Sequence, residues 1–213
     1  MDHHGFLTDE EIMDRRSELF RIEKGDDFAF ENALGASYDM RLGSEVYISG
    51  EDSPRLLNES NPFVSLPRGK FGLLLTKEYV TMPPDHSGLI SVRTTYKEKG
   101  LLNTSGFHVD PGFKGRLYFS VFNVGPNDIQ LKHNEPMFMI FFGRLSKSAN
   151  QKESKGRQGQ EHLPIALVTS LKGTSASLAD VDRRVGSLET LTRVLLTLSV
   201  ALVAAIITVA LAK

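Results

Sequence analysis

Cysteine and tryptophan are both absent from the 213-residue sequence. Without cysteine the protein has no disulfide framework, no thiolate zinc site, no cysteine nucleophile and no dithiol redox pair. The zinc-dependent nucleobase deaminases, whose metal is held by a Pro-Cys-x-x-Cys segment, are excluded for the same reason. The six histidines show no His-Glu-x-x-His or similar ligand spacing. We therefore expect no zinc and no metal site built on histidine.

The sequence also lacks a large excess of positive or negative charge. It has 25 Lys and Arg residues and 26 Asp and Glu residues, which gives a formal net charge of −1. The whole chain thus has no general attraction for polyanions, and we expect no nucleic-acid partner. Residues 1–19 contain acids and no apolar run, so the sequence predicts no secretory signal peptide and a soluble domain in the cytoplasm.

Charge is missing altogether from residues 194–212, which are rich in Leu, Val, Ala and Ile. A helix over this stretch would be roughly 28 Å long at about 1.5 Å per residue, close to the hydrocarbon thickness of a bilayer. The sequence therefore predicts a transmembrane helix over 194–212, a single-pass C-terminal tail anchor in a lipid bilayer. Thr192, Thr197 and Ser199 leave a second interpretation open, a buried or oligomerisation helix.

Just before that stretch, apolar residues follow the a/d spacing of a short coiled coil, which predicts a stalk over 178–193. The positions are Leu178, Val181, Val185, Leu188, Thr192 and Leu195. About two and a half heptads are marginal for an independent zipper, so we expect this helix to associate within a larger oligomer. Residues 146–177 include polar and small-residue stretches and are expected to form an arm and linker.

Residues 1–145 are expected to form one β-rich domain. Short alternating or apolar runs recur along it, over residues 38–42, 45–48, 71–76, 88–92, 116–124, 129–131 and 137–142. Gly, Pro, Asn and Asp residues separate these runs at roughly ten-residue intervals. This spacing predicts a mainly β fold, a distorted barrel or jelly roll. Near its start, Thr8 followed by Glu11 has the spacing of a helix capping box.

Two segments of this domain combine Gly with polar side chains suited to ligand binding. Strand alternation would put Asp39 and Arg41 on one face, where a surface ion pair is the simpler explanation. Arg93, with Thr94 and Thr95 beside it, can bind phosphate through a guanidinium fork and two hydroxyl donors. Neither segment is specific by itself.

Two further segments contain a turn or a basic loop. In 105–116 a proline and two glycines after Asp110 predict a tight hairpin that fixes its carboxylate. A fixed carboxylate can act as a general base or bind a sugar hydroxyl, whereas an Asp-Pro-Gly turn former is the purely structural alternative. In 156–160 a loop with Arg157 and Gln158 could fold over an anion, and a solvated linker is the alternative.

In order and spacing, these segments resemble the dCTP deaminase and dUTPase superfamily. The segments that carry the resemblance are 6–12 (FLTDEEI), 36–43 (ASYDMRLG), 81–85 (TMPPD), 93–95 (RTT), 109–115 (VDPGFKG), 119–125 (FSVFNVG) and 134–141 (NEPMFMIF). The hairpin 109–115 is the most specific of them, since it matches the I-D-P-G-[WF]-x-G pattern of the family closely. The resemblance covers residues 6–160.

The resemblance implies a dUTPase-like distorted β-barrel or jelly-roll subunit, a homotrimer, and interface sites for pyrimidine deoxynucleoside triphosphates, with Mg²⁺ on the nucleotide phosphates. It implies that Asp110 is the catalytic residue, which meets the deoxyribose or activates the hydrolytic water. The implied substrate-binding residues are Asp39, Arg93, Thr94, Thr95, Phe113, Arg157 and Gln158. Among these, the resemblance implies that Arg93, Thr94 and Thr95 contact the phosphates and that the ring of Phe113 packs on the sugar.

Two departures from the family pattern bear on the reaction. The deaminases activate water with a Glu in the strand after the hairpin, and Ser120 stands at the matching position. A serine hydroxyl near neutral pH does not replace a carboxylate base, so deamination is not expected. Glu98 stands where the family motif ends in Arg, which reverses one charge beside the expected phosphates.

Two functions therefore remain open from the sequence. The first is a membrane-anchored enzyme that hydrolyses dUTP or a related deoxynucleotide, with Asp110 as the base. The second is a catalytically inactive nucleotide sensor or membrane effector scaffold, acting in a stress or phage response. The intact hairpin favours the first function, and the predicted membrane anchor favours the second.

Overall fold

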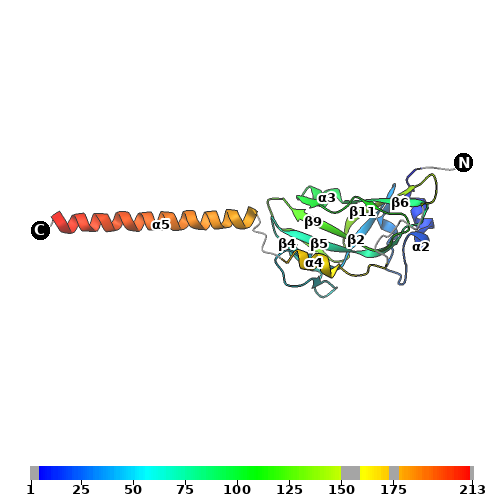
Figure 1. The fold of residues 1–213 in the computed structure, drawn as a ribbon, viewed down its shortest axis with the longest axis horizontal. Coiled ribbons are helices and arrows are strands. Elements are labelled where there is room, and N and C mark those ends of the chain that lie inside the picture. Colours follow the sequence, from blue (N-terminus) through cyan, green and yellow to red (C-terminus); the bar gives the residue numbers. More distant parts are fainter. Residues whose placement is uncertain (1–4, 150–158, 173–177, 212–213) are drawn as a thin grey trace. The chain divides into compact units, whose positions relative to one another are not determined.

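A computed structural model describes residues 5–149, 159–172 and 178–211 (Figure 1). The chain divides into two units, a head before residue 176 and a C-terminal unit after it, and each is described by itself. The head is mainly β, as the sequence predicts. Its strands are β1 (Ala33–Leu34), β2 (Ser37–Ile48), β3 (Arg55–Leu56), β4 (Phe63–Leu66), β5 (Phe71–Thr81), β6 (His86–Val92), β7 (Leu101–Asn103), β8 (His108–Val109), β9 (Lys114–Asn123), β10 (Ile129–Lys132) and β11 (Pro136–Arg144).

The helical elements of the head are short. They are α1 (Asp9–Asp14), α2 (Arg16–Leu19), the 3-10 turn η1 (Phe30–Asn32), α3 (Thr94–Lys97) and α4 (Ile165–Ser170). The predicted capping box starts α1: the Thr8 hydroxyl accepts from the Glu11 N–H, and the Glu11 carboxylate accepts from the Thr8 N–H. Such reciprocal bonds satisfy two backbone donors that a helix start otherwise leaves unpaired.

Strand β2 joins the two halves of the large curled sheet. The strand order is β7-β9-β5-β2-β11-β6-β8, and every named pairing is antiparallel. The first part of β2, through Arg41, pairs with β11, and the part from Leu42 onward pairs with β5. One long strand thus belongs to both halves of the sheet. The short strands β1 and β3 also pair with β2, and β10 with β4 forms a separate two-stranded sheet.

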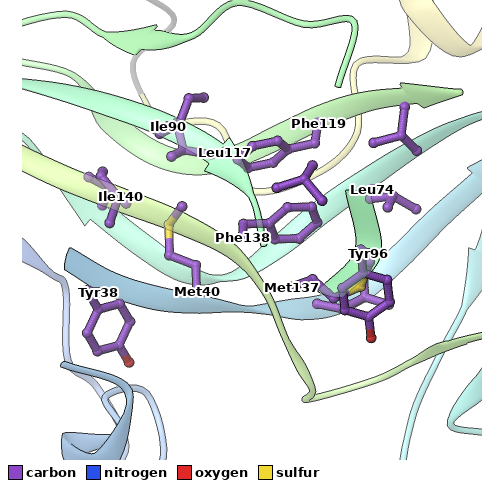
Figure 2. Packing of buried hydrophobic residues seen from close by; sticks show 14 of the residues in the cluster. Tyr38, Met40, Leu74, Ile90, Tyr96, Leu117, Phe119, Met137, Phe138 and Ile140 are labelled. Atoms are coloured by element: carbon purple, nitrogen blue, oxygen red, sulfur yellow. The ribbon is translucent and has the colours of Figure 1, made fainter. Parts of the chain in front are cut away.

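The core lies between the two halves of this curled sheet (Figure 2). Phe119 of β9 and Phe138 of β11 stack across it with ring centroids 4.0 Å apart and planes at 14°. Both rings are fully buried, and β9 alternates buried and half-exposed residues along its length. This contact buries two large apolar side chains in the core.

A second apolar cluster covers part of the outer face of the sheet. Helix α4, which lies within the segment 146–177 expected to be an arm and linker, contributes Val168. This side chain belongs to one cluster with Leu163, Leu73 of β5 and the fully buried Tyr47 of β2. Within the described residues 159–172, α4 is therefore packed on the head.

Helix α5 (Leu178–Leu211) forms the C-terminal unit and corrects one prediction. Within the residues that the structure describes, no helix has an apolar stretch sufficient to cross a membrane. The predicted tail anchor, its lipid partner and its membrane localisation are therefore wrong. Polar side chains enter the stretch that suggested the anchor: Thr197 and Ser199 donate hydroxyl hydrogen bonds to the carbonyls of Arg193 and Leu196.

The stalk predicted over 178–193 coincides with the first part of α5. Three of its spaced apolar residues, Val185, Leu188 and Leu195, are exposed to about half or more. A coiled coil made with further copies of the chain stays a prediction.

Candidate nucleotide pocket

The hairpin after β8 holds Asp110 at a rigid turn, as its sequence predicts. The Phe113 N–H donates to the Asp110 carbonyl at 3.1 Å, and Gly112 takes a φ of 78°, which favours glycine. Met82 ties this tip to the head, because it donates to the Phe113 carbonyl at 2.8 Å and accepts from Gly112 at 3.0 Å. The carboxylate of Asp110 is 58% exposed above this fixed backbone.

A pocket of about 220 Å³ opens beside the hairpin. Asp110 and Phe113 both line it, so two of the predicted site residues come together there. The complete lining is Ile90, Ser105, Gly106, His108, Val109, Asp110, Phe113, Arg116, Leu117, Tyr118 and Gln160. Leu117 and Val109 give the pocket an apolar base, while polar side chains occupy its walls. This mixture is typical of sites for small organic ligands.

The chain segment around Gln160 closes one side of the pocket. Gly115 and Gln160 form a parallel bridge, Arg116 donates to the Gln160 carbonyl at 2.7 Å, and Gly159 donates to the Lys114 carbonyl at 2.8 Å. A Cβ on Gly115 would lie only 3.1 Å from the backbone of Gln160. The close approach of the two segments therefore depends on glycine at position 115.

The residues predicted to bind phosphate, Arg93, Thr94 and Thr95, do not line this pocket. Arg93 precedes helix α3, and its Nε lies 3.0 Å from Asp39 Oδ2. Burial raises the pKa of the Asp39 carboxyl, and the Arg93 guanidinium opposes this shift. Thr94 and Thr95 follow in α3 with exposed side chains. The structure thus groups Asp39 with this second cluster of predicted residues.

Asp39 and Arg41 are not the surface ion pair that alternation suggested. Arg41 Nε donates to Glu78 Oε1 at 2.7 Å, and the Arg41 backbone N–H donates to the other carboxylate oxygen at 2.8 Å. Both members of this pair are buried. The partner of Arg41 comes from β5, 37 residues away, which local sequence spacing does not reveal. Arg157 and Gln158 lie outside the described residues, so their predicted closure over phosphates stays a prediction.

Several pocket residues were missed by sequence reasoning. They are Ser105, His108, Arg116, Tyr118 and Gln160. A signal for His108 was available, because residues 108 and 110 flank the apolar Val109 and alternate residues of a strand share a face. Arg116 and Tyr118 follow the same rule along β9. Gln160 gives no local signal, since its position depends on contacts with a hairpin 45 residues earlier in the chain.

The donor set for a metal is sparse. Among the residues described, no group of three or more His, Asp or Glu side chains could hold a metal ion. In the pocket, Asp110 is the one carboxylate among the lining residues. Magnesium is commonly held by one or two carboxylates together with substrate phosphates and water. The single carboxylate of the pocket thus suits a magnesium ion bound mainly by nucleotide phosphates better than one bound by protein ligands alone.

Comparisons with known proteins agree with this fold. The chain is 31% identical to the dCTP deaminase of Thermococcus kodakarensis over 140 residues, which cover 65% of this chain and 87% of that protein. It is 30% identical to the dCTP deaminase of Thermococcus gammatolerans over 151 residues, 69% of this chain and 93% of that protein. It is 30% identical to the "dCTP deaminase, dUMP-forming" of Methanopyrus kandleri, over 63% of this chain and 79% of that protein.

A crystal structure of 2'-deoxycytidine 5'-triphosphate deaminase from Agrobacterium tumefaciens has the same fold. The TM-score is 0.56 at 18% identity, over 71% of this chain and 52% of that chain. The curled sheet described above is therefore the fold of that deaminase. The family model described as dCTP deaminase-like matches residues 6–145. The chain belongs to the dCTP deaminase-like family.

Proposed function

We propose that this protein binds a pyrimidine deoxynucleoside triphosphate at the hairpin pocket and hydrolyses it to the monophosphate and pyrophosphate. The presence of Asp110 and Phe113 in one pocket, on a hairpin fixed by backbone hydrogen bonds, carries this proposal. The ring of Phe113 offers an apolar surface for a sugar, and the Asp110 carboxylate offers an acceptor for a hydroxyl or a water molecule.

Hydrolysis is favoured over deamination because of Ser120. This residue is half-buried on β9, where related deaminases are expected to use a Glu to activate water. Its hydroxyl is too weak a base to take a proton from water near neutral pH. Hydrolysis of a phosphoanhydride does not need an acid group at that position. The proposed substrate is dUTP or a related deoxynucleotide.

The complete site, we propose, is shared between copies of the chain in a homotrimer. A volume of about 220 Å³ is below the roughly 300–1,000 Å³ common for ligand pockets, so one copy encloses only part of a nucleotide. The residues suited to phosphate, Arg93, Thr94 and Thr95, do not line the pocket of their own chain. A neighbouring copy would bring them to the triphosphate, and the exposed apolar residues of α5 would associate with those of other copies.

Magnesium would accompany the nucleotide. When bound to the phosphates it supplies positive charge that stabilises the developing negative charge of the leaving group. The chain's own groups have the remaining roles: Phe113 orients the sugar, Asp110 holds a hydroxyl or water, and Arg93 contacts phosphate.

A second function, nucleotide sensing without turnover, is supported by the pairing of Arg93. Its guanidinium already contacts Asp39 and the Pro136 carbonyl, so part of its hydrogen-bonding capacity is engaged within the chain. In this case nucleotide binding would alter association of the chains rather than lead to chemistry.

One experiment separates the two functions. The purified full chain is incubated with each dNTP and magnesium, binding is followed by calorimetry, pyrophosphate release by a coupled assay, and mass by analytical ultracentrifugation. We expect binding and pyrophosphate release with a pyrimidine deoxynucleotide, a trimer mass, and slower release in Asp110→Asn. Saturable binding without release supports the sensor, and no binding to any dNTP refutes both functions.

A further inference from the structure

His108 and Asp110 lie next to each other on the wall of the pocket. His108 Nε2 is 3.4 Å from Asp110 Oδ1, and about half of each side chain is exposed. Two features fix this geometry. The residues are separated by the buried Val109, so both point away from the core, and β8 is paired with β6, where Leu89 is opposite His108. Catalytic hydrogen bonds are commonly longer than usual before a substrate binds.

The surroundings of the pair leave a nitrogen available to a ligand. His108 Nε2 faces the Asp110 carboxylate. A proton on Nε2 would be favoured beside that carboxylate, and the lone pair would then be on Nδ1. The remaining charged side chain of the pocket lining is Arg116, a permanent cation suited to an anionic ligand. Opposite His108 in the sheet stands the apolar Leu89, and the ring of Phe107 lies 5.1 Å from the imidazole.

We propose that His108 is the general base of this site and that Asp110 is the positioning residue that holds its imidazole. This inference rests on the proposed hydrolysis and assigns its proton transfer. An imidazole nitrogen is a stronger base than a carboxylate oxygen, and histidine is the side chain most often used as a general base.

The chemical step balances with water and nucleotide alone. The water oxygen forms a bond to the α-phosphorus, and one water proton passes to Nδ1 of His108. The bond between the α-phosphorus and the oxygen that bridges to the β-phosphorus breaks, and pyrophosphate leaves with the bonding electron pair. Asp110 stabilises the imidazolium that forms, and the imidazolium later returns its proton to solvent.

The test compares His108→Gln, Asp110→Asn and a control, His133→Gln, which removes an imidazole outside the pocket. Turnover of the pyrimidine deoxynucleotide is measured across pH together with nucleotide affinity. We expect His108→Gln to lower kcat by roughly 10²- to 10⁴-fold, the usual contribution of a general base, with little change in affinity. The loss of rate on the acidic side of neutrality should disappear in this variant, and added imidazole should restore part of the rate.

Asp110→Asn should lower kcat but keep the acidic fall in rate, because the base is still present. The control should behave like the original chain. Full activity of His108→Gln with an unchanged pH profile would overturn this inference while the hydrolase remains. Binding without turnover in the original chain would overturn it as well, and absence of binding would mean that the proposed function itself is wrong. Circular dichroism and urea unfolding of each variant show whether the fold is intact.

Discussion

The guanidinium of Arg93 lies 3.0 Å from the carboxylate of Asp39 and so joins the start of α3 to strand β2. The Asp39 side chain is 7% exposed and that of Arg93 33%. Because a buried carboxylate needs a partner, Arg93 has a structural role in addition to any contact with phosphate.

Arg93→Met should therefore destabilise the head by about 1–3 kcal/mol at neutral pH, since it leaves a buried charge without its cation. The pKa of Asp39 is already raised by burial, and loss of Arg93 raises it further. The carboxyl then protonates as the pH falls, so the loss of stability should shrink in acid. Urea unfolding at two pH values measures this. The double variant Arg93→Met with Asp39→Asn should recover part of the stability, and equal losses in single and double variants would contradict the argument.

Gly115→Ala should displace the chain segment that closes the pocket. The new methyl group would lie 3.1 Å from both the nitrogen and the oxygen of Gln160, and the Phe113 ring is equally near. We expect a loss of stability of about 1–3 kcal/mol, as for overpacking, and weaker nucleotide binding. Gly106→Ala is the matched control, because a Cβ there meets nothing within 4 Å although Gly106 lines the same pocket. Similar stability and affinity in the two variants would show that the approach of Gln160 is unimportant.

The features that sequence analysis predicted correctly depend on neighbouring residues. The Thr8 capping box and the Asp110 hairpin are examples, since turn and cap chemistry act within four residues. The pairing of Arg41 with Glu78 depends on the register between two strands. The approach of Gln160 to Gly115 depends on the chain coming back to the hairpin after 45 residues. Such contacts between distant segments leave no local pattern.

The error over residues 194–212 has a related cause. A count of uncharged residues estimates the length of an apolar helix, but hydroxyl side chains lower its apolarity. Thr197 and Ser199 bond within α5, as Thr192 does to the Leu188 carbonyl at 2.8 Å. These were the residues that left the alternative interpretation open.

Tyr47→Phe and Tyr38→Phe should change stability in different directions. Both rings are fully buried. Among the described residues, the Tyr47 hydroxyl makes no hydrogen bond of full geometry, although the Gly50 backbone opposes the rise that burial causes in its pKa. The Tyr38 hydroxyl, in contrast, accepts from the Ala29 N–H at 3.0 Å. Removing an unpaired buried hydroxyl should be neutral or stabilise by up to about 1 kcal/mol, and removing the paired one should cost about 1–3 kcal/mol. Thermal unfolding measures the stability of the two variants. An equal loss of stability in both would mean that the Tyr47 hydroxyl has a hydrogen-bond partner.

Ser120 leads to a prediction about deamination. The original chain should release no ammonia from dCTP, because a serine hydroxyl does not activate water near neutral pH. Ser120→Glu places a carboxylate on the half-exposed side of β9 and should give measurable release of ammonia. Ser120→Gln has nearly the same shape without the acid group and should remain inactive. Ammonia release by the original chain would show that another group activates water for deamination.

The capping box predicts how stability depends on pH. The pKa of Glu11 is lowered, first by the Thr8 backbone N–H and further by Arg144, whose Nη2 lies 2.7 Å from the carboxylate. A lowered carboxyl pKa gives stability that is complete above the unfolded value of roughly 4.3 and is lost as the pH falls through the lower folded value. Glu11→Gln should therefore destabilise the head at pH 7 by less than about 1 kcal/mol, since the carboxylate is partly exposed, and by less at pH 2. Urea unfolding at both pH values measures the difference. Glu10→Gln removes a charge from the same helical turn as the control, and an equal pH dependence in both variants would assign the effect to net charge rather than to the cap.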